Sequence, residues 1–380
     1  MPLHMSRRRF IGTALTAAPA FSVPAAETVK AFSFPLLGDL HFDKLDHHDF
    51  TWLEKEKPGD IKQIQNYSRI TSDVSPRLFA RVRETVASLT ANGFRTPFVL
   101  QVGDLVEGLC GSLERSTRQN REALAFVRDA RLGVPFLFAK GNHDVTGPGA
   151  VEAFRNEFHP FLSEQTGGFT GGGKVSAGYY SIEHGGAQFC FFDAYAAESL
   201  NWLEATLAKR TVRHCFVVIH PPVVPYGARS NWNLYSSAKQ KPQREKLLEL
   251  LGHHRAFVLG GHIHKFNLLV RETPRGGRFL QLAVSSILNA PELKPKDALT
   301  GIEQYNGDQV RVEPSFSPET EKERRAVYDA ERPFVKSFEY ADLPGYAVVS
   351  VSEDSVQAMI YPGTSGDAWR TLDLTKLLHA

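Results

Sequence analysis

The sequence has few cysteines, little net charge and no long apolar run. Its three cysteines, Cys110, Cys190 and Cys215, are too few for a disulfide-stapled scaffold, and none lies in a C-x-x-C pair, which excludes a zinc ribbon or a dithiol redox site. The 44 Lys and Arg residues nearly balance the 42 Asp and Glu residues, and a formal charge of +2 argues against nucleic-acid binding by bulk electrostatics. The whole sequence is 42% hydrophobic and 23% charged, which is an ordinary globular composition and excludes a fibre or a coiled-coil rod.

The first 25 residues have the layout of an export signal. Adjacent arginines, Arg7 to Arg9, precede a short apolar stretch at residues 11–23, and small residues follow at 24–26. The Ser-Arg-Arg-x-Phe run resembles a twin-arginine signal, which a receptor reads and which is not an anchor. The stretch is also shorter than the roughly 20 apolar residues that span a bilayer. We therefore expect a signal peptide at 1–25, a periplasmic or secreted protein without a stable membrane anchor, and one domain at 26–380; the alternative is a disordered basic tail.

Short apolar runs alternate with helical patterns along the rest of the chain. Five runs that end at a glycine or a polar cluster predict buried strands, at 34–37, 98–102, 135–139, 216–219 and 256–259. Apolar stripes predict helices between them, one of them made by Leu78, Val82, Val86 and Leu89. This alternation favours α/β layers. A hairpin around Gly185-Gly186 excludes a purely parallel sheet, and two closing strands are expected at 347–351 and 356–360.

Two stretches show little pattern. Residues 43–75 carry histidines, a tryptophan and a charged run without a clear period, and residues 290–340 are polar and contain proline, with one helix expected near 319–330. Each is interpreted as either a surface excursion or a lid over a site. Asp43 is expected to be a surface acid, and His47 and His48 to be a solvated pair in a loop, although these two histidines could contact substrate.

The informative residues follow the ends of the five predicted strands. They are three carboxylates, an amide and five imidazoles, in the order Asp39, His41, Asp104, Asn142, His143, Asp144, His220, His262 and His264. Because ligands in open α/β sheets gather beyond the carboxyl ends of the strands, we expect these side chains to share one rim. Nitrogen and oxygen ligands without thiolate suit manganese, iron, cobalt, nickel or zinc, whereas calcium prefers oxygen.

Seven metal-ligand groups, which this set of residues can supply, are too many for one ion and fit two. A shared carboxylate allows two dications to lie roughly 3.5–4 Å apart, the separation used for in-line displacement at phosphorus. The two ions would lower the pKa of a bridging water toward neutrality and so produce a hydroxide nucleophile. The sequence therefore predicts two transition-metal ions, such as Mn, Fe or Zn, and a phosphate-ester substrate.

The ordered blocks Asp-x-His, Gly-Asp, Gly-Asn-His-Asp, His and Gly-His-x-His resemble the calcineurin-like metallophosphoesterase superfamily. They run from Asp39 to His264. Because its third block ends in Asp, the sequence resembles the class III cyclic nucleotide phosphodiesterase subset of this superfamily. It differs from purple acid phosphatases, because Leu105-Val106-Glu107 after Asp104 lacks the tyrosine expected of them. The resemblance implies an α/β (α+β) fold, a four-layer αββα sandwich of mixed sheets flanked by helices. The long separation of Asp39 from Asp104 implies an insertion near 43–75.

Carried over by position, the resemblance also implies a role for each residue. Asp39, His41 and His264 would hold the first metal, and Asn142, His220 and His262 the second. Asp104 would bridge both. His143 would assist the leaving group as proton donor or charge stabiliser, and Asp144 would orient His143 and favour its protonated form.

The expected activity is therefore that of an exported dinuclear hydrolase of small phosphate esters, with phosphodiesters favoured by the Gly-Asn-His-Asp form. Phosphomonoester hydrolysis and a non-catalytic scaffold of the same fold are the alternatives. The substrate-binding residues are not identified. A loop with Arg229, Asn231, Trp232 and Tyr235 could bind the non-phosphate part of a substrate or be an ordinary surface loop, and Glu107 is expected to support the site rather than act in catalysis.

Overall fold

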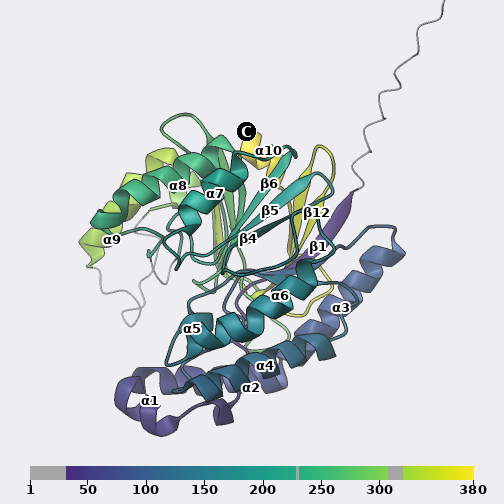
Figure 1. The fold of residues 1–380 in the computed structure, drawn as a ribbon. Helices are drawn as coiled ribbons and strands as arrows, with labels where there is room; N and C mark the ends of the chain where they lie inside the picture. The colour runs from purple at the N-terminus through teal and green to yellow at the C-terminus, as the bar shows by residue number, and fades with distance from the viewer. Residues whose placement is uncertain (1–30, 228–230, 307–319) are drawn as a thin grey trace, which may run out of the picture.

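The computed structural model describes residues 31–227, 231–306 and 320–380. Two mixed β-sheets pack face to face, and helices cover both outer faces (Figure 1). The predicted four-layer α/β sandwich is confirmed. The expected export signal at 1–25 and Arg229 lie outside the described residues.

The first sheet has six strands in the order β14-β13-β12-β1-β2-β3. Their bounds are β1 Phe32–Leu37, β2 Val99–Gln101, β3 Phe136–Phe138, β12 Gly345–Val351, β13 Val356–Pro362 and β14 Arg370–Asp373. β1, β2 and β3 are parallel, whereas β12 pairs with β1 in the antiparallel sense. Every residue of β1 is buried, which agrees with its apolar sequence and its place in the sheet interior. The predicted strands at 34–37, 98–102 and 135–139 and the two closing strands are confirmed.

The second sheet has eight strands in the order β10-β11-β8-β9-β7-β6-β5-β4. Their bounds are β4 Tyr180–His184, β5 Ala187–Phe192, β6 His214–Ile219, β7 Phe257–Gly260, β8 Phe266–Glu272, β9 Arg278–Ala283, β10 Lys296–Thr300 and β11 Val335–Asp342. β5, β6 and β7 are parallel neighbours. The predicted hairpin is confirmed, because β4 and β5 pair antiparallel around Gly185-Gly186.

The helices form the two outer layers. On the side of the six-stranded sheet lie α2 Ile61–Asp73, α3 Ser75–Ala91, α4 Leu113–Asp129 and α6 His159–Thr166 (Figure 1). On the side of the eight-stranded sheet lie α7 Ser199–Leu207, α8 Lys241–His253 and α9 Glu321–Glu331. Shorter helices are α1 Phe50–Glu56, α5 Ala150–Ala153 and α10 Leu374–His379. In the stripe of α3, Leu78, Val82 and Val86 are buried, as the spacing predicts, and Leu89 at its end is partly buried.

Aromatic rings fill the space between the two sheets. The ring of Phe34 in β1 lies 5.5 Å from that of Phe189 in β5 and 6.0 Å from that of Phe216 in β6. Phe98 lies 5.1 Å from Phe189. These contacts join the parallel strands of one sheet to those of the other, so the carboxyl ends of both sets of strands come together at one rim.

The two stretches without a sequence pattern have regular structure. Residues 43–75 form α1 and α2 with short 3-10 turns, and α2 buries Ile64, Tyr67 and Ile70. Within 290–340, predicted as a polar excursion, β10 and β11 join the eight-stranded sheet and β11 pairs with β8. Only the helix expected near 319–330 is seen there as predicted, as α9.

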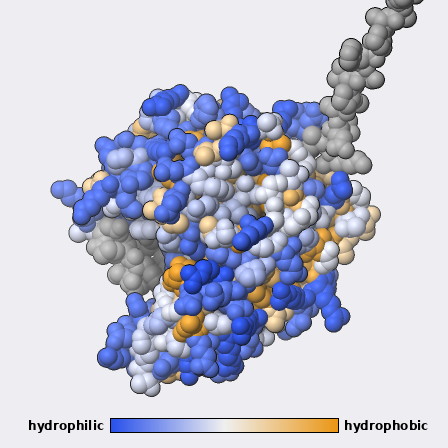
Figure 2. Space-filling model, in the orientation of Figure 1, coloured by the Kyte–Doolittle hydropathy of each residue, from blue (hydrophilic) through white to orange (hydrophobic). Residues whose placement is uncertain are grey.

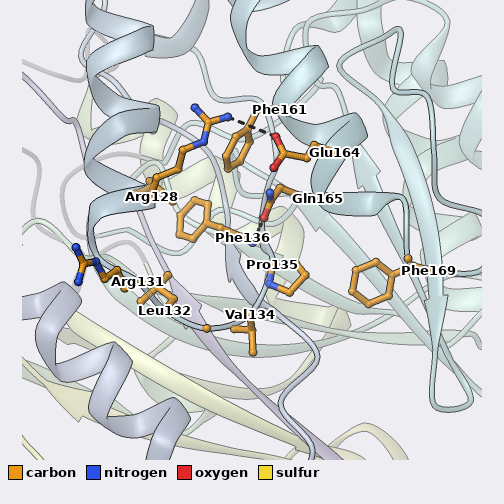
Figure 3. Close-up of a pocket in the computed structure, with 13 residues that line it drawn as sticks. Arg128, Arg131, Leu132, Val134, Pro135, Phe136, Phe161, Glu164, Gln165 and Phe169 are labelled. Carbon is orange, nitrogen blue, oxygen red and sulfur yellow. Dashed lines mark hydrogen bonds and ion pairs between the residues drawn. The ribbon is translucent and has the colours of Figure 1, made fainter.

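The surface view in Figure 2 is mostly hydrophilic, with apolar residues scattered over it. No helix within the described residues is both long and apolar enough to cross a membrane. A cavity of about 710 Å³ lies among α4, β3 and α6, where Phe136, Phe161 and Arg128 line it (Figure 3). It lies at the start of β3, whereas the predicted ligand residues follow the strand ends, so this cavity is separate from the predicted site.

Candidate metal centre

All seven predicted metal ligands follow the carboxyl ends of parallel strands. Asp39 and His41 follow β1, Asp104 follows β2, Asn142 follows β3, His220 follows β6, and His262 and His264 follow β7. Three of these strands belong to the six-stranded sheet and two to the eight-stranded sheet. The packing of the two sheets therefore brings residues from distant parts of the chain to one place.

One group of possible ligand atoms comes from Asp39, His41 and His264, whose metal-binding atoms lie within 4.8 Å of one another. The Nε2 atoms of His41 and His264 are 3.2 Å apart. His264 Nε2 lies 3.6 Å from Asp39 Oδ1, and His41 Nε2 lies 3.7 Å from Asp104 Oδ2. This group has the donor set for one transition-metal ion.

A second group comes from Asp104, His220 and His262, again with its atoms within 4.8 Å of one another. His220 Nε2 is 3.0 Å from Asp104 Oδ2 and 3.2 Å from Asn142 Oδ1. His262 Nδ1 is 2.9 Å from Asn142 Oδ1. Asp104 Oδ2 thus faces histidines of both groups, which is the geometry that a shared carboxylate requires.

Two buried oxygens indicate that cations fit here. Among the residues that the structure describes, Asp39 Oδ2 and Asp104 Oδ2 are buried and have no well-directed hydrogen-bond donor. An unpaired buried carboxylate oxygen is costly, and a cation would compensate both. Burial and the negative charge of Asp104 raise the pKa of Asp39. Burial of Asp104 is outweighed by the charges of His220 and His143, which hold the pKa of Asp104 well below its usual value, so Asp39 is the less well compensated carboxylate of the two.

The two histidines of the second group differ in proton affinity. Burial opposes a charge on His220, but the neighbouring Asp104 outweighs it and raises the pKa of His220 to about 9. Burial, together with a charge on His220, lowers the pKa of His262 to about 3. Since a metal ligand must be a neutral imidazole, cation binding would displace a proton from His220.

The backbone of the site is held in an unusual conformation. His41, Asp104, His262 and His264 have φ values of 45°, 56°, 70° and 59°, in the left-handed region that non-glycine residues seldom adopt. Glycines make room for the carboxylates: a Cβ atom at Gly141 would collide with the side chain of Asp104, and one at Gly261 with that of Asp39. The glycines of the Gly-Asn-His-Asp and Gly-His-x-His blocks are therefore steric requirements of the site.

His143 lies beside the ligand cluster, and its carboxylate partner is Glu107. The His143 backbone N–H donates to Asp104 Oδ1 at 2.8 Å. Its ring Nδ1 lies 2.8 Å from the Glu107 carbonyl oxygen and 3.2 Å from Glu107 Oε2. Glu107 Oε2 also lies 2.7 Å from His41 Nδ1. Burial opposes the charged ring, but Glu107 and Asp104 raise the pKa of His143 well above its usual value.

The role predicted for Asp144 is wrong. Its carboxylate does not orient the His143 ring, because it accepts hydrogen bonds from four backbone N–H groups, those of Asp104, Leu105, Val106 and Gly141. Burial and the nearby Asp104 charge raise the pKa of Asp144 to about 6, although these hydrogen bonds oppose the rise. Asp144 therefore shapes the two turns that carry Asp104 and Asn142.

The helices of residues 43–75 also contribute to the site. Tyr67 of α2 stacks on the His41 ring at 4.4 Å, and Gln63 Nε2 donates to Glu107 Oε1 at 3.2 Å. The sequence offered no signal for these contacts, because residues 43–75 show no clear apolar period.

Asp43, His47 and His48 are buried, so the prediction of a surface acid and a solvated histidine pair is wrong. The Asp43 carboxylate accepts hydrogen bonds from His48 Nε2 at 2.7 Å, from Ser68 Oγ at 2.8 Å and from Gln119 Nε2 at 2.8 Å. This network joins α2 and α4 to the loop that follows His41.

A buried ion pair between Lys140 and Asp193 also lies near the ligand residues. Lys140 precedes Gly141-Asn142 after β3, and Asp193 follows β5. The Asp193 carboxylate additionally accepts from the Tyr195 backbone N–H at 2.9 Å. Sequence reasoning missed Asp193, although it follows an apolar strand in the same way as the predicted ligands do.

Comparison with known proteins agrees with this geometry. A family model described as calcineurin-like phosphoesterase matches residues 34–266, well over half of the chain. Purple acid phosphatase PPD1 from yellow lupin (Lupinus luteus) seeds has a similar structure, with a TM-score of 0.52 and 12% identity over 92% of this chain and 55% of that one. This chain therefore spans about half the length of the lupin protein, and identity this low shows a shared fold alone.

Two further solved structures are similar. A dimetal phosphatase from Danio rerio has a TM-score of 0.49 and 12% identity, over 92% of this chain and 99% of that one. PhoD has a TM-score of 0.49 and 13% identity, over 91% of this chain and 69% of that one. Among curated proteins none matches this chain.

Proposed function

This chain belongs to the calcineurin-like phosphoesterase family, and on that premise we propose that it hydrolyses phosphate esters at a pair of transition-metal ions, with phosphodiesters preferred. The observation that carries the proposal is the pair of ligand groups that meet at Asp104. The preference for diesters rests on the Gly-Asn-His-Asp form of the third block alone. Comparison of bis-p-nitrophenyl phosphate with p-nitrophenyl phosphate tests it, and faster turnover of the monoester would contradict it.

We assign the ligands by their grouping. Asp39, His41 and His264 would hold one ion, Asn142, His220 and His262 the other, and Asp104 both. When bound, such ions stabilise negative charge on the phosphoryl group and activate water as the nucleophile, and Mn, Fe or Zn suits these donors.

The side chains of the protein would carry the proton to the leaving group. His143 is partly exposed, lies 4.6 Å ring to ring from His41, and has its Nδ1 side turned to Glu107. That leaves Nε2 as the nitrogen that can face the substrate. Glu107 favours the protonated ring, so His143 would donate a proton to the departing alkoxide.

Metal content and turnover test the assignment together. Asp104→Asn should lower the bound metal from about two ions per chain to one or fewer, because one carboxylate serves both groups. His143→Gln should retain both ions but lower kcat by roughly 10²–10⁴-fold, the usual contribution of a positioned acid. Asp73→Asn, an exposed carboxylate on α2, is the matched control. Wild-type protein that carries no metal after incubation with manganese, zinc or iron would favour the non-catalytic scaffold instead.

We also propose that residues 1–25 direct export by the twin-arginine route. The support is the Ser-Arg-Arg-x-Phe run and the apolar stretch after it. Replacement of Arg7 and Arg8 by lysine should retain the protein in the cytoplasm of a bacterial host. Unchanged export of the doubly substituted chain would contradict the proposal.

A further inference from the structure

We propose that Trp232 determines substrate specificity by packing against a planar aromatic group in the ester, so that phosphate esters with an aromatic substituent are the preferred class. The inference rests on the proposed phosphoesterase function and adds the chemistry of the non-phosphate part. It concerns residues 231–235, in the loop between β6 and α8, for which the sequence left open either substrate binding or a plain surface role.

Trp232 lies directly against the ligand cluster. Its ring centroid is 4.9 Å from that of His262, and the two rings are tilted by 46°. His262 Nδ1 is in turn 3.3 Å from His220 Nε2 and 2.9 Å from Asn142 Oδ1. An ester whose phosphoryl group sits among these ligands would therefore have a substituent within reach of the indole.

The partial exposure of the indole also suits this role. Asn231 and Asn233, on either side of it, are buried, whereas Trp232 itself is partly exposed. A partly exposed indole beside a polar cluster presents part of its flat aromatic surface to a ligand. A planar ring makes more contact with such a surface than an alkyl chain does.

Side chains of β9 and α8 hold residues 223 and 224, before Trp232, and Leu234, after it, in place. Gln281 of β9 accepts from the backbone N–H groups of Val223 and Val224 at 2.9 and 3.0 Å. Arg244 of α8 donates to the carbonyl oxygens of Val223 and Leu234 at 2.8 and 3.3 Å. The described backbone at Val223, Val224 and Leu234 is thus held in place, which lowers the entropy that binding near Trp232 would cost.

Two tyrosines from residues 290–340 also hold the loop that precedes Trp232. Tyr305 donates its hydroxyl hydrogen to the Pro225 carbonyl oxygen at 2.7 Å, and Tyr328 of α9 donates to the Gly227 carbonyl oxygen at 3.1 Å. Both tyrosines are fully buried and their rings pack together at 5.2 Å. This stretch, which has no other assigned role, therefore positions the specificity loop from behind.

The test compares substrates within each variant. Wild-type protein, Trp232→Ala and Trp232→Phe are loaded with manganese, and kcat and KM are measured for bis-p-nitrophenyl phosphate, cyclic AMP and glycerophosphoethanolamine. Trp232→Ala should lower kcat/KM about 5- to 15-fold for bis-p-nitrophenyl phosphate, alone or together with cyclic AMP, mainly through KM, and less than about 2-fold for the alkyl ester. Trp232→Phe should retain most of the aromatic preference, and bound metal should be unchanged in both variants.

The pattern of losses identifies the aromatic group. A loss on bis-p-nitrophenyl phosphate alone indicates a ring attached directly to the ester oxygen, and a loss on cyclic AMP as well indicates that a base beyond a sugar also reaches Trp232. Tyr328→Phe, which removes the hydrogen bond to the Gly227 carbonyl oxygen, should give a smaller loss with the same substrate pattern.

A control variant separates a specific effect of Trp232 from a general loss of activity. Trp202→Ala removes a partly buried tryptophan that packs on Tyr179, and it should change all three substrates equally or not at all. An equal effect of Trp232→Ala on the aromatic and alkyl esters would overturn the role of Trp232 and leave the phosphoesterase proposal intact. Failure of metal-loaded wild-type protein to hydrolyse any ester would overturn the proposed function and this inference with it.

Discussion

Glu107 is the residue on which two functions of the site depend. One of its oxygens contacts both His41, a proposed metal ligand, and His143, the proposed proton donor. Burial would raise the pKa of Glu107, but the charge and hydrogen bonds of the two histidines outweigh it and lower this pKa to about 2, so the carboxylate is ionised at neutral pH. It can therefore orient one ring and favour the protonated form of the other.

Glu107→Gln is expected to retain the fold and lower kcat by about 10- to 100-fold, since loss of a group that orients a metal ligand commonly has that effect. The pH at which activity falls on the alkaline side should also move down, because the neutral amide no longer favours protonated His143. Turnover as a function of pH, with metal content measured in parallel, checks both. Glu122→Gln is a matched control, because Glu122 contacts His47 in a similar way but lies outside the ligand cluster. An unchanged pH profile would contradict the proposed link between Glu107 and His143.

At the scale of secondary-structure elements, the Lys140–Asp193 ion pair connects the end of β3 in one sheet to the end of β5 in the other. Both side chains are largely buried, with exposed fractions of 13% and 2%. Lys140 lies two residues before Asn142, so the ion pair also holds the turn that carries this proposed ligand.

Asp193→Leu is expected to lower the free energy of unfolding by about 3 kcal/mol, because it leaves the Lys140 charge buried and unpaired. The double variant Lys140→Met/Asp193→Leu should be more stable than Asp193→Leu alone, since no charge remains without a partner. Denaturant unfolding of the metal-free proteins measures this. A double variant with the summed loss of the two single variants would show that the residues do not act as a pair.

Sequence patterns located the elements well where packing repeats a simple period. The apolar runs of β1, β2, β3, β6 and β7 and the stripe of α3 predicted these elements because each is buried along a continuous face. The helix α2 within residues 43–75 was not predicted, because it buries tyrosine, serine and threonine along with isoleucine and its buried face is therefore not uniformly apolar. Within 290–340, β10 is mostly exposed and so lacks the apolar pattern of a buried strand.

At the scale of the whole molecule, the two sheets meet at a rim that brings buried carboxylates together. Asp39 and Asp104 are buried, and each has an oxygen without a well-directed donor. Strained backbone at four proposed ligands adds a further cost there. Bound cations would offset both effects, so we expect metal binding to stabilise the folded protein as well as to enable turnover.

Removal of metal with a chelator should lower the melting temperature by roughly 5 °C or more. A ligand at about 100 times its Kd stabilises by about 2.7 kcal/mol, and each kcal/mol corresponds to roughly 2–4 °C in a large domain. Thermal unfolding with and without added manganese measures the shift. Asp104→Asn should respond much less than the wild type, and an equal response in both would place the stabilising metal elsewhere.

The sequence by itself determined the order of the strands with polar ends and the residue types that follow them. Those features are local: an apolar run predicts a strand, and parallel strands in layers bring their carboxyl ends to one rim. Only the tertiary structure decided which carboxylate serves His143, that Asp43 is buried, and that Asp193 pairs with Lys140. The physical reason is that the strength and role of a charged group depend on its burial and its neighbours. Those neighbours come from segments dozens of residues away, whose pairing no local pattern records.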